Sequence, residues 1–99
     1  MDIRILKREK DTLEFEIVGE DHTFCNLLRE LLSRDERVVM AAYRVDHPLV
    51  GHPRFVVMTD GSADPKDVLL EKAKLMRDLA LEFKEACAKA LSGEYEKKR

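Results

Sequence analysis

The sequence predicts an α+β domain with the element order β-β-α-β-β-α. Short segments with alternating apolar residues flank one helix-periodic stretch, and a second, much longer helix-periodic stretch closes the chain. At 99 residues the chain is long enough for one domain and too short for two. We therefore expect a single domain over residues 1–99.

The first two strands are expected at residues 3–7 and 13–18, joined as a hairpin through residues 8–12. In the second of them, Leu13, Phe15 and Ile17 alternate with two glutamates. Alternation with a period of two places the three apolar side chains on one face of a strand and the carboxylates on the other. One face of the sheet must therefore be covered.

The first helix follows the break at residues 19–23, where Asp21 or Thr23 can act as the N-cap. Its apolar residues follow the i, i+3, i+4, i+7, i+8 spacing of one helical stripe. They are Phe24, Leu27, Leu28, Leu31 and Leu32. We expect this helix to lie on the sheet.

The third strand is expected around residues 38–45, with Val39, Ala41 and Tyr43 on one face. Its other face is apolar too, which predicts a central, well-covered strand. Two prolines make residues 46–53 a loop. Residues 55–58 form the fourth strand, followed by a turn at residues 59–62.

The last helix begins with Asp64 as N-cap and Pro65 at its first position, and its periodicity continues to about Leu91. Gly93 is expected to end it, leaving residues 93–99 as a flexible tail. A rod of about 40 Å is longer than such a small domain, at ~1.5 Å per residue. Part of this helix should overhang the domain or meet a partner.

The apolar residues of the long helix form two neighbouring rows. One row steps by four and three residues as in a heptad: Leu69, Ala73, Met76, Ala80, Phe83, Cys87 and Ala90. The second consists of Val68, Leu75, Leu79 and Ala86. Such a stripe is most often core of the same chain, but here its width and reach favour a hypothesis in which one row packs on the chain's own sheet and the other on a second polypeptide.

Composition argues against several classes of protein. The net charge is −2, acidic and basic residues are interspersed, and aromatic residues make up 6% without Trp, so no direct contact with nucleic acid is expected. The longest apolar runs fall far short of the ~20 residues of a membrane helix. Without a recognisable signal peptide, the cytoplasm is the expected location.

No catalytic, cofactor or metal site is predicted, because the common phosphate-binding, hydrolase and zinc-protease motifs do not occur. His22 and Cys25 are spaced for one helical turn and could bind a metal with His47 or His52. A surface or capping His22 and a buried thiol at Cys25 are favoured. Cys87 also fits packing better than nucleophilic chemistry.

The run Glu20-Asp21-His22-Thr23-Phe24-Cys25-Asn26-Leu27-Leu28-Arg29, followed by Ala42-Tyr43, Asp46-His47-Pro48-Leu49 and Asp64-Pro65, resembles one family. It is the archaeal subunit L family, the small alpha-like subunits of multisubunit RNA polymerases. Many eukaryotic relatives have Leu-Gly at Phe24-Cys25, where archaeal relatives often have Phe and a larger residue. The resemblance extends over nearly the whole chain.

The resemblance implies a four-stranded antiparallel sheet with two helices, the alpha-like dimerisation domain. It also implies a non-catalytic subunit that pairs through the long helix with the larger alpha-like subunit of RNA polymerase, the D subunit. In that family the pair is the platform on which the large catalytic subunits assemble. Nucleotidyl transfer belongs to those subunits, so this chain would be part of an enzyme without catalysing the reaction.

Two groups of residues are expected to carry these roles. The partner interface is expected at Phe24, Leu28, Leu31, Leu69, Met76, Leu79, Phe83 and Cys87. The resemblance further implies an assembly motif facing a large subunit, formed by Asp21, His22, Thr23, Asn26, Arg29, His47 and Pro48.

Two other functions stay open on the sequence. One is a self-associating α+β scaffold outside transcription, in which two copies pair their long helices. The other is a small enzyme or metal-binding module built around His22, Cys25 and the loop from His47 to His52.

Overall fold

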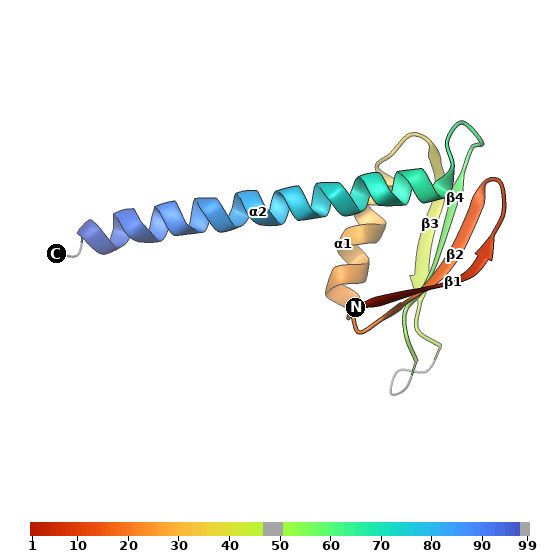
Figure 1. Ribbon diagram of the computed structural model, residues 1–99, viewed down its shortest axis with the longest axis horizontal. Coiled ribbons are helices and arrows are strands. Elements are labelled where there is room, and N and C mark those ends of the chain that lie inside the picture. Colours follow the sequence, from red (N-terminus) through yellow and green to blue (C-terminus); the bar gives the residue numbers. More distant parts are fainter. Residues whose placement is uncertain (47–50, 98–99) are drawn as a thin grey trace.

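The computed structural model describes residues 1–46 and 51–97, with side chains described up to residue 92. Four strands and two helices follow one another in the predicted order (Figure 1). They are β1 (Asp2–Arg8), β2 (Thr12–Val18), α1 (His22–Ser33), β3 (Val38–Arg44), β4 (Arg54–Thr59) and α2 (Pro65–Lys97). The predicted fold class is confirmed.

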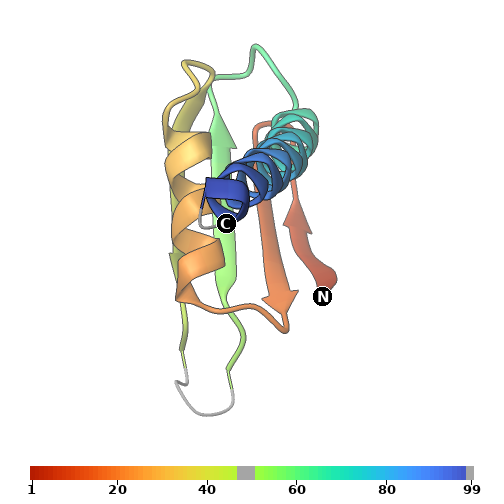
Figure 2. The same ribbon diagram turned by 90° about the vertical axis from the view of Figure 1, so that its left-hand side faces the viewer.

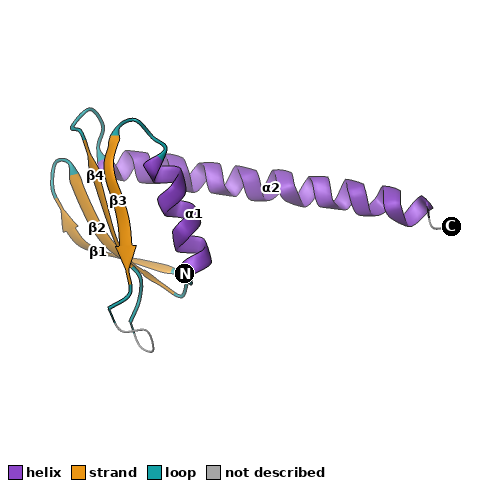
Figure 3. Ribbon diagram, turned by 180° about the vertical axis from the view of Figure 1, so that it is seen from behind, coloured by secondary structure: helices purple, strands orange, loops and turns teal. Residues whose placement is uncertain are grey.

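The four strands form one antiparallel sheet in the order β1-β2-β4-β3. Both helices lie on the same side of this sheet, as the view from behind shows clearly (Figure 3). Seen along the long axis, α1 runs over β3 and β4 while α2 projects from the region of β2 (Figure 2). Neither helix covers β1, at the edge of the sheet.

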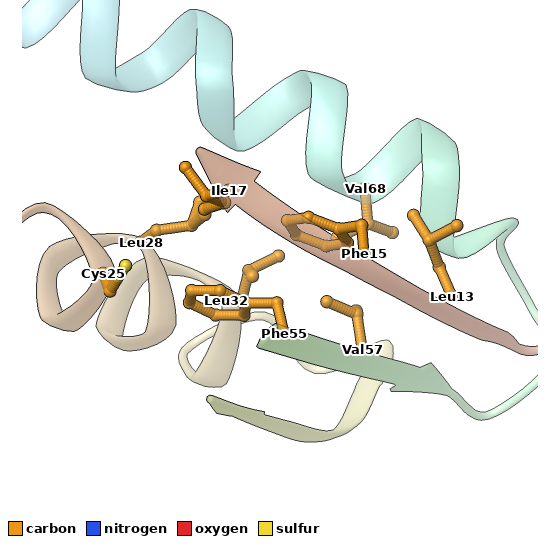
Figure 4. Packing of buried hydrophobic residues seen from close by; sticks show 9 residues of the cluster. All are labelled: Leu13, Phe15, Ile17, Cys25, Leu28, Leu32, Phe55, Val57 and Val68. Carbon is orange, nitrogen blue, oxygen red and sulfur yellow. The ribbon is translucent and has the colours of Figure 1, made fainter. Parts of the chain in front are cut away.

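The core fills the space between the sheet and the two helices (Figure 4). It consists of Leu13, Phe15, Ile17, Cys25, Leu28, Leu32, Phe55, Val57 and Val68. Three directly opposed aromatic residues cross its centre: Phe15 stacks on Phe55 at a centroid distance of 5.4 Å, and Tyr43 stacks on Phe55 at 5.3 Å. The alternation predicted for residues 13–17 is thus observed, with the apolar side chains inward.

Aspartates cap both helices at the predicted positions. The Asp21 carboxylate accepts hydrogen bonds from the backbone amides of Thr23 and Phe24 at 3.1 and 3.2 Å. At α2, the Asp64 carboxylate accepts a 2.9 Å hydrogen bond from the Lys66 amide, one residue after the buried Pro65. These bonds satisfy amides that have no partner within the first helical turn.

β3 corrects one prediction, because it lies at an edge of the sheet and not at its centre. Val39 is an extra residue in the pairing with β4 and forms a bulge. The bulge turns Val38 toward the core together with Ala41 and Tyr43. Val39 and Met40 are left 67% and 42% exposed. A strand that is apolar on both faces is therefore buried on one face only.

α2 corrects a second prediction. It has 33 residues and continues to Lys97, so Gly93 does not end it. Glycine costs a helix only about 1 kcal/mol, and the glutamates and lysine that follow are good helix formers. At ~1.5 Å per residue the helix is about 50 Å long. The flexibility of residues 93–99 stays a prediction, and residues 98–99 lie outside the described part.

A cluster of charges fastens the base of α2 to the turn between α1 and β3. The Asp35 carboxylate, with 9% of its side chain exposed, accepts bonds of 2.7 and 2.9 Å from the Arg37 guanidinium and lies 3.0 Å from Lys72 Nζ. Arg37 also pairs with Glu71. Hydrogen bonds from Arg37, then from Lys72, hold the pKa of Asp35 well below its usual range. The direction of α2 relative to the sheet is thereby supported by two ion pairs.

Candidate partner interface

An open apolar groove of about 830 Å³ lies beside the core. Its floor is the inner face of β1 and β2, and its walls are the first four turns of α2 and the first half of α1. The lining residues are Met1, Ile3, Ile5, Arg8, Leu13, Phe15, Ile17, Phe24, Leu27, Leu28, Lys66, Leu69, Leu70, Ala73, Met76, Arg77 and Ala80. Fourteen of these seventeen side chains are apolar, so water covers a surface that would be more stable against another apolar element.

The groove is open because β1 has no covering helix. All seven residues of β1 are exposed, including Ile3 at 50% and Ile5 at 54%. An extra residue, Leu6, interrupts the pairing of β1 with β2 and is itself 40% exposed. Isolated exposed apolar residues are ordinary on a protein surface, but these continue into the groove floor. This edge of the sheet is therefore incomplete as a core.

Past the groove, α2 projects from the domain with its apolar residues exposed (Figure 1). The exposed fractions are 46% for Leu79, 54% for Leu81, 71% for Phe83 and 64% for Leu91. Charged residues are interleaved with them, and within the described part of the chain no helix is long and apolar enough to cross a membrane. The overhanging turns therefore present apolar side chains to solvent.

The division of α2 between its own domain and solvent differs from the hypothesis of two rows. Val68 of one row is fully buried, and Leu69 and Met76 of the other also pack against the core. Leu79 and Phe83, one from each row, are both exposed. The helix is therefore divided along its length, since both rows start on the sheet and both run off it.

The eight residues of the predicted partner interface lie in three places. Phe24, Leu28, Leu69 and Met76 line the groove. Leu28 is 4% exposed and thus mainly a core residue of its own chain. Leu31 is half-buried on α1 and is not part of the groove lining. Leu79, Phe83 and Cys87 lie farther along α2, with Cys87 half-buried and the other two exposed.

Sequence reasoning missed the β1 side of the groove. Ile3 and Ile5 were expected within a covered sheet, and Leu27 was assigned to the stripe that packs on it, yet Leu27 is 48% exposed. Leu70, outside both helical rows, is 60% exposed and also lines the groove. A signal was present, because the one short helix cannot cover a whole sheet of four strands with its apolar stripe. The position of β1 at the edge does not follow from the pattern.

The predicted assembly motif lies on and just before α1, outside the groove lining. Asp21 acts as the N-cap, and the exposed His22 has its Nδ1 3.1 Å from the Tyr43 hydroxyl. Thr23 and Asn26 are exposed, and Arg29 is half-buried. The remaining two members, His47 and Pro48, lie outside the described residues. The described members therefore form a polar surface at the start of α1.

The metal-binding alternative finds little support at His22 and Cys25. Cys25 is fully buried in the core, and burial, with the nearby Asp21 and Glu20 carboxylates, raises the pKa of its thiol to about 11. A thiol of that pKa is protonated at neutral pH and is a poor nucleophile and ligand. Among residues 1–46 and 51–97 no three His, Cys, Asp or Glu side chains are grouped as metal ligands.

Comparison with known proteins gives concordant matches. The family described as the RNA polymerase Rpb3/Rpb11 dimerisation domain matches residues 12–86. The DNA-directed RNA polymerase subunit Rpo11 of Pyrococcus abyssi is 45% identical over 95 residues, covering 94% of this chain and 100% of that protein. The Rpo11 subunit of Saccharolobus islandicus is 42% identical over 83 residues, covering 84% and 90%.

A solved structure agrees with these matches. The crystal structure of DNA-directed RNA polymerase subunit L from Thermoplasma acidophilum superposes with a TM-score of 0.66 at 26% identity, covering 85% of this chain and 86% of that one. The family match begins at β2 and extends into the overhanging turns of α2. With its open groove, its overhanging helix and these relatives, the chain belongs to the RNA polymerase Rpb3/Rpb11 dimerisation domain family.

Proposed function

We propose that this chain is a non-catalytic subunit of an archaeal RNA polymerase, acting in the cytoplasm and paired with the larger alpha-like D subunit, its alpha-like partner. The observation that supports this most strongly is the apolar groove continuous with an overhanging helix, in a chain whose relatives are named RNA polymerase subunits. The heterodimer would then be the platform on which the large catalytic subunits assemble.

Differential burial of apolar surface explains why the chain would pair. Burying an exposed Leu, Ile or Phe side chain is worth about 1.5–3 kcal/mol. Ile3, Ile5, Leu70 and Phe83 are all at least half exposed in the isolated chain. A partner that fills the groove and follows α2 removes these side chains from water together, which can offset the entropic cost of association.

The polar surface at the start of α1 supports the second part of the proposal. His22, Asn26 and Arg29 recur at i, i+4 and i+7 and so share one side of α1. None of them lines the groove, so a partner bound there leaves them accessible. We assign to this surface the contact with a large subunit. Catalysis and the binding of nucleic acid would lie in the large subunits.

Co-expression with an archaeal alpha-like partner tests the proposal. The 11.5 kDa chain and the alpha-like partner should co-purify, and light scattering should give the mass of a 1:1 complex. The chain alone should aggregate or be unstable. A well-behaved monomer that fails to bind the alpha-like partner would refute the proposal.

The same measurement addresses the self-associating scaffold. The groove could also accept α2 of a second copy, which would give a stable homodimer of twice the chain mass. A homodimer that persists when the alpha-like partner is added in excess would favour the scaffold outside transcription.

A further inference from the structure

The charges at the groove carry information about what fills it. Three ionisable side chains line the groove, Arg8, Lys66 and Arg77, and all three are cations. The whole chain has 18 basic and 20 acidic residues, so its composition does not account for this bias. The lining is thus apolar with a positively charged rim.

The cations have only weak partners within their own chain. Arg8 lies 3.5 Å from Asp64, Lys66 lies 3.9 Å from Asp67, and Arg77 lies 3.7 Å from Asp78. A charge-assisted hydrogen bond is shorter, about 2.7–2.9 Å, and exposed pairs of this kind contribute little to stability. No carboxylate of these pairs lines the groove. The three cations are therefore available to an incoming group.

The rim has a definite geometry along α2. Lys66 and Arg77 are about 11 residues apart, which corresponds to three turns and about 16 Å, and both point to the same side of the helix. Between them the lining is apolar, with Leu69, Leu70, Ala73 and Met76. Arg8 lines the groove from the far end of β1.

We propose, resting on the proposed function, that the occupant of this groove is an amphipathic helix of the alpha-like partner, with an apolar stripe and carboxylates spaced to match Lys66 and Arg77. Its apolar stripe fills the space above β1 and β2. Its carboxylates bind Lys66 at one end and Arg77 at the other. Burial next to an unpaired cation is costly, so the rim rejects segments with basic ends and selects acidic ones.

Paired charge reversals test this selection in the complete chain. In Lys66→Glu/Arg77→Glu, we expect the affinity for the alpha-like partner to fall at least tenfold, mainly through slower association, and its salt dependence to weaken or change sign. The matched control is Lys74→Glu/Lys89→Glu, which changes the net charge equally at exposed α2 positions outside the groove lining. The control should change the affinity less than threefold.

Charge-reversal rescue identifies the carboxylates. Among Asp→Lys and Glu→Lys variants of the alpha-like partner, at least one should bind Lys66→Glu/Arg77→Glu more tightly than the wild-type chain. Equal affinity of the groove reversal and the wild type for the alpha-like partner would overturn the inference while leaving the proposed function intact. A wild-type chain that fails to bind the alpha-like partner, or whose groove reversal disrupts a homodimer instead, would overturn both.

Discussion

Phe55 is the residue on which the core of this domain depends most. It is fully buried and lies between Phe15 and Tyr43 in the aromatic row that crosses three strands. Replacing it with a small side chain leaves a cavity and removes both stacking contacts. We expect Phe55→Ala to lower the free energy of unfolding by about 3–5 kcal/mol in urea denaturation.

Val39→Ala is the matched control, since Val39 is 67% exposed at the bulge of β3. It should change the free energy of unfolding by less than about 0.5 kcal/mol. Similar values for the two variants would mean that the aromatic row does not carry the core.

Asp35 makes stability depend on pH. Its pKa lies below the unfolded value of about 3.9, mainly because of hydrogen bonds from Arg37. A carboxylate of lowered pKa contributes stability above its unfolded pKa, and this contribution is lost as pH falls toward the folded pKa. The stability difference between the wild type and Asp35→Asn should therefore be largest above pH ~5 and shrink steadily toward pH ~2.

Urea denaturation at a series of pH values measures this difference. Glu36→Gln serves as the control, because Glu36 is an exposed carboxylate in the same turn. Its effect should be small and nearly constant with pH. A constant difference for Asp35→Asn would show that the ion pairs at the base of α2 do not stabilise the domain.

At the scale of elements, the strands show what a pattern can and cannot predict. The alternation in β2 predicts the right face, because polar and apolar residues separate cleanly between the core and water. In β3 both faces are apolar, so no contrast marks the exposed one, and the bulge at Val39 changes the alternation locally. The apolar outer face is typical of a central strand, although β3 is an edge.

The candidate interface was predictable on one side only. The apolar pattern and length of α2 indicated a partner, and the structure shows its distal turns exposed. The β1 wall depends on which strand lies at the edge and which helix covers it, and both follow from tertiary packing. Ile3 and Ile5 have the same sequence pattern whether a helix of this chain or of another covers them.

Phe83 tests the role of the overhanging part of α2. With 71% of the side chain exposed, Phe83→Glu should leave the stability of the isolated chain nearly unchanged. In a complex it would bury an uncompensated carboxylate, which costs several kcal/mol. We expect affinity for the alpha-like partner to fall ~100-fold or more, about 2.7 kcal/mol, in a binding titration.

Lys84→Glu is the neighbouring control at an exposed position and should reduce affinity much less. Unchanged affinity of a folded Phe83→Glu chain would place the interface elsewhere on α2.

At the scale of the whole molecule, the chain combines a small domain with a helix that extends well past it. The longest dimension is 59 Å, whereas the shortest is 18 Å. The core extends from Leu13 to Val68, its half-buried neighbours reach Met76, and the groove lining ends at Ala80. The described turns beyond Ala80 are therefore held only by their own backbone hydrogen bonds.

Hydrogen exchange can detect this asymmetry along one helix. A short helical segment without tertiary contacts is marginally stable in water, so its amides open easily. In the isolated chain, residues 81–92 should exchange at least tenfold faster than residues 68–76, which pack on the core. With the alpha-like partner bound, residues 81–92 should become the most strongly protected relative to the free chain, since the partner would supply the missing packing.

The start of α1 provides the internal control for this experiment. His22, Asn26 and Arg29 lie outside the groove lining, so their segment should keep its exchange rate when the alpha-like partner binds and slow only when a large subunit is added. Protection of residues 81–92 already in the isolated chain, at a concentration where light scattering shows a monomer, would contradict the division of α2 along its length. Protection that rises with chain concentration alone would identify a second copy as the partner.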